Sequence, residues 1–170
     1  MSVKVLVISG SMGAGKTTVL GEASDLLAAR AIPHAAIDLD AVAAVFLPEE
    51  SMRRLAMRNL AAIFENFVSA GIQRVLLAVA VESRGDLQTL RAAMSNPELM
   101  VCRLLAPLET IEHRIRLREP GMHQEVFVAR SRSLDAILSA AKVEDFTALN
   151  AGGDISGVAL DVLQRAGWIP

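Results

Sequence analysis

The stretch Gly10-Ser11-Met12-Gly13-Ala14-Gly15-Lys16-Thr17 fits the pattern G-x-x-x-x-G-K-[ST] and decides the fold of this chain. It follows Val3–Ile8, a β-branched apolar run typical of a buried strand, and it leads into a helical pattern over 16–30. A strand, a glycine-rich loop and a helix in this order are the context in which the pattern binds phosphate. The sequence therefore predicts a P-loop for a nucleoside triphosphate.

The residue types in this loop suit a polyphosphate and its metal ion. Glycines allow consecutive backbone N–H groups to curve around a β-phosphate, and the N-terminus of the helix adds partial positive charge. Lys16 can bridge the β- and γ-phosphates, while the Thr17 hydroxyl can bind Mg²⁺. The residues expected to contact the nucleotide here are Gly10, Ser11, Met12, Gly13, Ala14, Gly15, Lys16, Thr17 and Thr18.

Short apolar runs alternate with helical patterns along the whole chain. The expected strands are 3–8, 32–38, 75–81, 99–105 and 146–149. The expected helices are 16–30, 41–47, 49–70, 85–94, 108–118, 126–141 and 156–166. This alternation indicates a parallel sheet with helices on both faces. The 170 residues contain no repeat, low-complexity segment or linker, so we expect a single domain over 1–170.

Composition narrows the class of protein. Hydrophobic residues make up 52% of the chain, but no apolar run is long enough for a membrane span. The beginning of the chain lacks the layout of a signal peptide, and a net charge of −2 offers no general attraction to nucleic acid. Cys102 lies in an apolar run and is expected to be buried and inert. We expect a cytoplasmic protein without nucleic-acid or membrane partners, and the sequence leaves its oligomeric state open.

Two acids follow the second expected strand, in Ile37-Asp38-Leu39-Asp40. Residues just beyond the carboxyl end of a strand face the binding crevice of an open α/β sheet. There, Asp38 can hold a water on Mg²⁺, and Asp40 can orient an acceptor hydroxyl or accept its proton. In a simpler alternative, Asp40 caps the next helical turn and Asp38 is only solvated. No Walker B Asp ends the run 75–81, so the acidic partner of the metal is either Asp38 or Glu82.

The order and spacing of these elements resemble the small P-loop kinases, the family of adenylate kinase, shikimate kinase, gluconate kinase and chloramphenicol phosphotransferase. The P-loop and the Asp38-x-Asp40 pair resemble the shikimate and gluconate kinases in particular. The resemblance implies a P-loop NTPase fold of three α/β/α layers, with a five-stranded parallel sheet of order 2-3-1-4-5. It also implies ATP and Mg²⁺ as ligands and a small lid at about 119–132. No N-K-x-D motif occurs and no D-x-x-G follows the apolar run 75–81, which argues against a GTPase.

The basic end of the helix 108–118 resembles the family's helix that leads into the lid. By spacing, Arg114 matches an arginine that stacks on adenine, and Arg118 matches one that reaches the phosphates. Two more arginines match the family's returning lid arginines less closely. The catalytic set implied in this way is Lys16, Asp40, Arg118, Arg130 and Arg132. The cationic stretch Met52–Arg58 could face an acidic substrate, but it is expected to be a solvated helix face.

The signature of nucleoside-monophosphate kinases, D-G-[FY]-P-R, is absent, and the corresponding place reads Ala80-Val81-Glu82-Ser83-Arg84. We therefore expect an acceptor other than a nucleoside monophosphate, in contact with Asp38, Asp40, Glu82 and Arg84. Thr17 and Asp38 are the expected metal-binding residues. The predicted function is transfer of the ATP γ-phosphate to a small hydroxylated molecule. The alternative is a nucleotide-binding switch or ATPase module that has no such acceptor.

Overall fold

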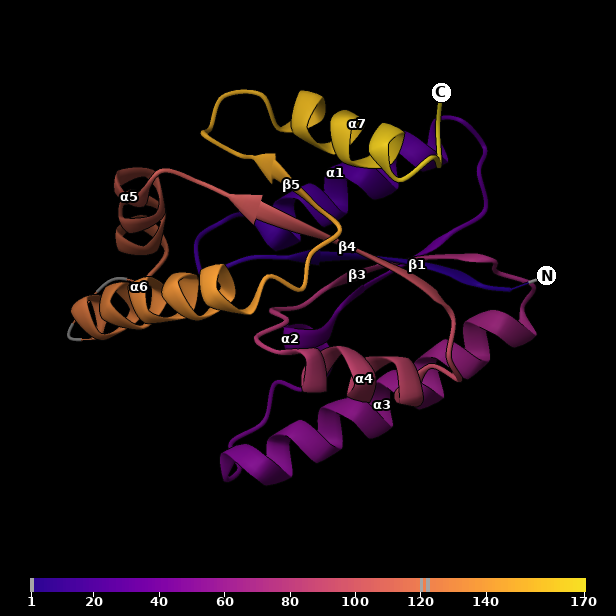
Figure 1. The fold of residues 1–170 in the computed structure, drawn as a ribbon, viewed down its shortest axis with the longest axis horizontal. Coiled ribbons are helices and arrows are strands. Elements are labelled where there is room, and N and C mark those ends of the chain that lie inside the picture. The colour runs from indigo at the N-terminus through magenta and orange to yellow at the C-terminus, as the bar shows by residue number, and fades with distance from the viewer. Residues whose placement is uncertain (1, 120, 122) are drawn as a thin grey trace.

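The computed structural model describes residues 2–119, 121 and 123–170. A parallel sheet forms the middle layer, with helices above and below it (Figure 1). The strands are β1 (Lys4–Ser9), β2 (Ala35–Asp38), β3 (Arg74–Ala78), β4 (Glu98–Leu105) and β5 (Phe146–Leu149). Their order in the sheet is β2-β3-β1-β4-β5. The fold class and the strand order expected from the resemblance are confirmed.

The helices are α1 (Lys16–Ala28), α2 (Leu39–Val42), α3 (Glu49–Ser69), α4 (Arg84–Ala93), α5 (Leu108–Arg118), α6 (Gln124–Ala141) and α7 (Ile155–Arg165). In Figure 1, α1 and α7 cover one face of the sheet, and α3 and α4 cover the other. Helices α5 and α6 lie toward the carboxyl ends of β4 and β5. In the described part of the chain, no helix is both long and apolar enough to cross a bilayer.

Successive side chains of the central strand β1 belong alternately to two hydrophobic cores, one on each face of the sheet. Leu6 and Ile8 of β1 belong to the hydrophobic cluster shared with α1 and α7, whereas Val5 and Val7 belong to the cluster shared with α3 and α4. Successive side chains of a strand point to opposite faces, so a strand buried on both faces reads as one continuous apolar run. This explains why the run before the P-loop contains no alternation of polar residues.

Two expected boundaries differ from the structure at the edge of the sheet where the strands end. β3 stops at Ala78 and not at Val81, because the next backbone donors turn toward β1: Val79 N donates to Ile8 O and Val81 N donates to Ser9 Oγ, at 3.2 and 3.1 Å. Helix α2 begins at Leu39 and not at residue 41, because Asp38 caps it. The earlier end of β3 and the earlier start of α2 place the chain after β3 and the acids Asp38 and Asp40 at the carboxyl edge of the sheet.

The segment expected to form a lid, at about 119–132, includes the start of helix α6. Helix α6 already begins at Gln124, so a connection of a few residues follows α5, and both predicted lid arginines, Arg130 and Arg132, lie within α6. The Gln124 side chain donates to the carbonyl oxygens of Arg116 and Glu119, which ties the start of α6 to the end of α5. Pro120, half of the Pro-Gly pair in this connection, lies outside the described residues. The candidate lid is thus an α5–α6 hairpin.

Candidate active site

The loop between β1 and α1 contains three glycines in the left-handed region of backbone space. Gly10, Gly13 and Gly15 have φ values of 151°, 82° and 97°. A Cβ at Gly15 would lie 2.4 Å from Asn150 Nδ2, and a Cβ at Gly13 would lie 3.0 Å from Ile111 O. Larger residues would therefore disturb the packing of the loop. Gly15 is the N-cap of α1 and has no side chain to cap it, so the first N–H groups of this helix are available to an anion.

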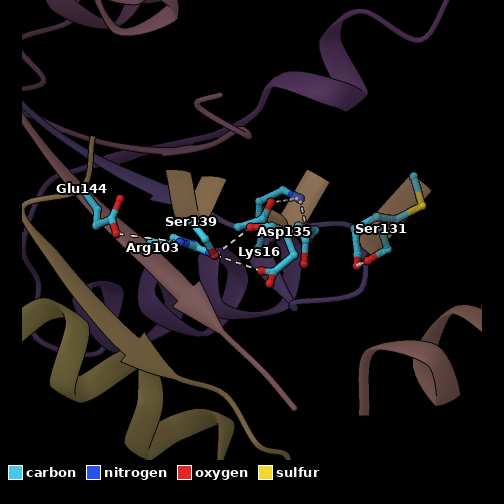
Figure 2. Close-up of polar contacts among 9 residues, drawn as sticks. Lys16, Arg103, Ser131, Asp135, Ser139 and Glu144 are labelled. Atoms are coloured by element: carbon cyan, nitrogen blue, oxygen red, sulfur yellow. Dashed lines mark hydrogen bonds and ion pairs between the residues drawn. The ribbon is translucent and has the colours of Figure 1, made fainter. Parts of the chain in front are cut away.

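The Lys16 side chain folds back over this loop. Its Nζ donates to Gly10 O at 3.0 Å and to Ser11 O at 3.2 Å, and the lysine is labelled in Figure 2. Burial lowers the pKa of Lys16; the nearby carboxylates of Asp40 and Asp38 partly offset this, and Arg118 adds to it. A partly desolvated ammonium bound only to carbonyl oxygens is well placed to exchange them for phosphate oxygens.

Thr17 and Asp38, the pair expected to hold the metal, are in contact. Thr17 Oγ1 donates to Asp38 Oδ2 at 2.6 Å, although the two residues are 21 positions apart in the chain. A hydroxyl and a carboxylate are the hard oxygen ligands that Mg²⁺ prefers. Among the described residues, no group of three or more His, Cys, Asp or Glu side chains could hold a metal ion. This pair therefore fits a Mg²⁺ that takes its other ligands from phosphate and water, as is usual for this ion.

The N-terminus of α2 leaves the Asp40 side chain available to contact a ligand. Asp38, and not Asp40, is the N-cap of α2: Asp38 Oδ1 accepts from Asp40 N at 3.1 Å. The alternative in which Asp40 is the cap is therefore wrong. The Asp40 side chain forms no hydrogen bond or ion pair with any described residue, and it lines the cleft beside the P-loop. The carboxylate of Asp40 is also the largest influence that raises the pKa of Lys16, and both residues line the same cleft.

A cleft of about 1010 Å³ extends from the P-loop to α3 and α4. Its volume is at the upper end of the range of about 300–1,000 Å³ for ligand pockets, which leaves room for more than one ligand. Predicted site residues that line it are Met12, Gly13, Gly15, Lys16, Thr17, Thr18, Asp40, Glu82, Arg114, Arg118 and Arg130. Predicted site residues outside its lining are Gly10, Ser11, Ala14, Asp38, Arg84 and Arg132.

Arg114 lies against the P-loop, where it contacts backbone oxygens. Its guanidinium donates to Gly13 O at 3.2 Å, to Ala14 O at 3.4 Å and to Asn150 Oδ1 at 3.2 Å. Asn150 is buried, and its Nδ2 donates to Ala14 O at 2.8 Å. The sequence interpretation missed Asn150. The available signal was its position just after β5, the same carboxyl edge of the sheet that singled out Asp38.

The remaining arginines are placed differently from one another. Arg118 and Arg130 line the cleft from α5 and α6, and the Arg118 guanidinium also pairs with Glu119 at 3.0 Å. Arg132 instead pairs with Glu112 of α5, and Arg84 is an exposed residue at the start of α4. Arg53, assigned from the sequence to a solvated helix face, lines the cleft opposite the P-loop. The structure therefore brings Arg118 and Arg130 into the site, adds Arg53, and leaves Arg132 and Arg84 outside.

Helix α6 is attached to both the P-loop and the sheet. Ser131 Oγ donates to Met12 O at 2.7 Å. Figure 2 shows the second attachment, where Arg103 of β4 lies among Asp135, Ser139 and Glu144. Its guanidinium is 2.9 Å from Asp135 Oδ1, 2.8 Å from Ser139 Oγ and 3.9 Å from Glu144 Oε1. These contacts fix the helix that carries Arg130.

Comparison with known proteins shows which solved structures have a similar fold. No protein-family model and no curated protein matches the chain. Among solved structures, the APS kinase CysC of Mycobacterium tuberculosis, solved with AMPPNP and APS, shares 16% identity over 98% of both chains, with a TM-score of 0.68. The shikimate kinase of Acinetobacter baumannii, solved with shikimate, shares 19% identity over 98% of this chain and 93% of that one, with a TM-score of 0.64. A gluconokinase of Sinorhizobium meliloti shares 20% identity over 96% and 93%, with a TM-score of 0.60.

These likenesses extend over nearly the whole chain, from β1 to α7, and the sheet order is the one expected from the family resemblance. The chain therefore has the fold of the small P-loop kinases. At 16–20% identity the likeness concerns the fold, and the chemistry has to be argued from the residues in the cleft.

Proposed function

We propose that this protein is an ATP-dependent kinase that transfers the γ-phosphate to the hydroxyl group of a small molecule. Asp40 carries the proposal. Its carboxylate has no partner among the described residues, lines the same cleft as Lys16 and raises the pKa of that lysine. A carboxylate close to the expected γ-phosphate position can orient an acceptor hydroxyl and accept its proton.

The other residues of the cleft fit this chemistry. Thr17 and Asp38 would hold Mg²⁺, which, when bound, neutralises charge on the β- and γ-phosphates. Lys16 would exchange its two carbonyl partners for phosphate oxygens. Arg118 and Arg130 line the cleft from the α5–α6 hairpin and would stabilise the charge that develops during transfer. Closure of this hairpin over the nucleotide would exclude water from the γ-phosphate.

The alternative of a nucleotide-binding switch or ATPase fits the same P-loop but accounts for less of the cleft. A protein that only binds ATP does not need an unpaired carboxylate beside the P-loop. It also does not need the additional volume that reaches Met52, Met57 and Leu90, on the far side from the nucleotide loop. We therefore favour transfer to a second ligand.

A screen for acceptors tests the proposal. Purified protein is incubated with Mg²⁺–ATP and hydroxylated compounds, including metabolites and aminoglycoside- or chloramphenicol-like antibiotics, and ADP release is measured. We expect at least one compound to raise ADP production well above the rate with water alone, and Lys16→Ala to abolish the increase. If ATP binds but no compound raises ADP production, the kinase proposal is wrong and the switch remains.

A further inference from the structure

The two ends of the cleft carry opposite charge. At the P-loop end the lining cations are Lys16, Arg114, Arg118 and Arg130. At the opposite end, formed by α3 and the chain around the start of α4, the lining acids are Glu49, Glu82 and Asp86, and the lining cation is Arg53; Asp40 lies beside the P-loop. If ATP occupies the P-loop end, as the proposed function requires, the acceptor lies at the acidic end.

Arg53 is already paired within the protein. Its guanidinium is 3.3 Å from Glu49 Oε1 and 3.6 Å from Asp86 Oδ1. Asp86 also accepts from Glu82 N at 3.1 Å, so the carboxylate of Asp86 is bound on both oxygens. The three residues neutralise one another in part, so an anionic ligand at Arg53 would have to compete with two carboxylates.

Glu82 is in the opposite situation. It is half-buried, it lines the cleft, and its carboxylate forms no hydrogen bond or ion pair with any described residue. Asp38 already accompanies Thr17 at the expected metal position, so Glu82 is not needed there. A partly desolvated carboxylate without a partner strongly disfavours an anion beside it and is stabilised by a cation.

The walls around this acidic end are largely apolar. The larger apolar residues that line the cleft there are Leu39, Val45, Met52, Met57, Val79 and Leu90. Apolar walls gain free energy from an apolar ligand surface and gain nothing from a polyhydroxylated one. The unpaired carboxylate of Glu82 and the apolar walls of the cleft therefore restrict the acceptor independently: the first favours a cationic group, and the second favours an apolar body.

We propose that the acceptor is an amphipathic amino alcohol, with an apolar body, a protonated amine that pairs with Glu82 and a hydroxyl oriented by Asp40. The hydroxyl oxygen forms a bond to the γ-phosphorus while the bond from that phosphorus to the β,γ-bridging oxygen breaks. ADP leaves with the electron pair, and the hydroxyl proton passes to Asp40. The products are ADP and a phosphate monoester that still carries the amine.

Matched sets of three compounds test this inference. Within a set, every compound has the same apolar body and one hydroxyl. The first set is phenylalaninol, its neutral N-acetyl derivative and the anionic phenyllactate. The second set is leucinol, N-acetyl-leucinol and 2-hydroxyisocaproate. ADP release gives kcat/KM for each compound at saturating ATP. We expect the amine to exceed both other members of at least one set by about tenfold or more, a factor that corresponds to about 1.4 kcal/mol.

Variants assign the preference to Glu82. Glu82→Gln is expected to raise KM for the amine and to bring the three compounds of a set within about threefold of one another, with ATP affinity unchanged. Glu50→Gln is the matched control, because its carboxylate pairs with Arg54, is largely exposed and does not line the cleft; the amine preference should persist. Circular dichroism and thermal melting verify that both variants are folded.

The possible failures are distinguishable. If other hydroxyl compounds are phosphorylated but the amines show no preference, or if Glu82→Gln leaves the preference intact, this inference is wrong while the kinase proposal holds. If no hydroxyl compound of any charge raises ADP release, the proposed function is itself wrong.

Discussion

At the scale of single residues, the site depends on groups that the fold leaves without a strong partner. Lys16 is bound to two backbone carbonyls, while Asp40 and Glu82 line the cleft without partners among the described residues. Most buried polar groups are paired within a protein, so the half-buried Lys16 and Glu82 indicate ligand contacts, whereas Asp40 is exposed and is singled out by its position in the cleft. Each of these three groups gives a prediction of a different kind.

Nucleotide affinity should depend on pH through Lys16. Burial lowers the pKa of Lys16 in the free protein, and a bound polyphosphate raises it again. The complex then binds more protons than the free protein, so affinity falls as pH rises between the two pKa values. We expect the Kd for AMPPNP to increase as the pH rises toward the usual lysine pKa of about 10.4.

Titration calorimetry at several pH values measures this effect. Lys16→Met, which has no titrating group at this position, should bind weakly and with a smaller dependence on pH. A wild-type Kd that is constant over the range, or an equal slope in Lys16→Met, would contradict the role given to the lysine.

At the scale of secondary-structure elements, the α5–α6 hairpin is joined to the rest of the site by a few polar contacts. Arg103 in β4 is only 5% exposed, and its pairing with Asp135 and Ser139 holds the middle of α6 against the sheet. Removing one partner of a buried charge leaves that charge uncompensated, which usually costs more than an exposed ion pair contributes.

We expect Asp135→Ala to lower the free energy of unfolding by about 2–3 kcal/mol, since Glu144 and Ser139 only partly compensate Arg103. Glu50→Ala is the matched control, because it removes an acid paired with Arg54 at the exposed start of α3; its effect should be at most about 1 kcal/mol. Urea denaturation measures both. Equal losses in the two variants would show that the Arg103 network does not anchor α6.

The hairpin is also predicted to respond to the nucleotide. Arg118 and Arg130 line the cleft from its two helices, so a bound polyphosphate should stabilise them and slow backbone amide exchange in α5 and in the first half of α6. Hydrogen exchange with and without Mg²⁺–AMPPNP measures this, with α7 as the internal reference. Equal exchange in both states would leave these arginines as surface charges and remove the lid assignment.

Much of the element level could be predicted from the sequence, because periodicity and turn residues act locally. The P-loop between β1 and α1 and the alternation of strands with helices are examples, while the strand order followed from the family resemblance. The parts that could not be predicted depend on distant contacts. Asn150 reaches Ala14 across 136 positions, and Arg132 turns to Glu112 across 20. A pattern of residue types identifies which arginines could reach a phosphate, but competition among nearby acids decides which of them do.

At the scale of the whole molecule, the two cores meet across a sheet that is buried on both faces. Cys102 in β4 is fully buried in the cluster under α1 and α7, and burial raises the pKa of its thiol to about 12. The expectation of a buried cysteine is confirmed. At neutral pH the thiol is protonated and shielded, so it should react only when this core opens.

Cys102 therefore serves as an internal probe of unfolding. We expect a thiol reagent such as DTNB to label it only at the rate of core opening, and Mg²⁺–ATP to slow labelling further, because a ligand bound only to the folded state stabilises it by mass action. Lys16→Ala should lose the protection by ATP and keep the slow basal labelling. Rapid labelling of the native protein, or no effect of ATP, would contradict this description.

The central claim, transfer of a phosphoryl group to an acceptor beside Asp40, is tested most directly by Asp40→Asn. The variant keeps the size of the side chain and removes its charge and its capacity to accept a proton. We predict that the Kd for Mg²⁺–ATP changes by less than about threefold, while acceptor-dependent ADP release falls by about 10²-fold or more. If ADP release is unchanged in Asp40→Asn, the carboxylate does not act on an acceptor and the account is contradicted.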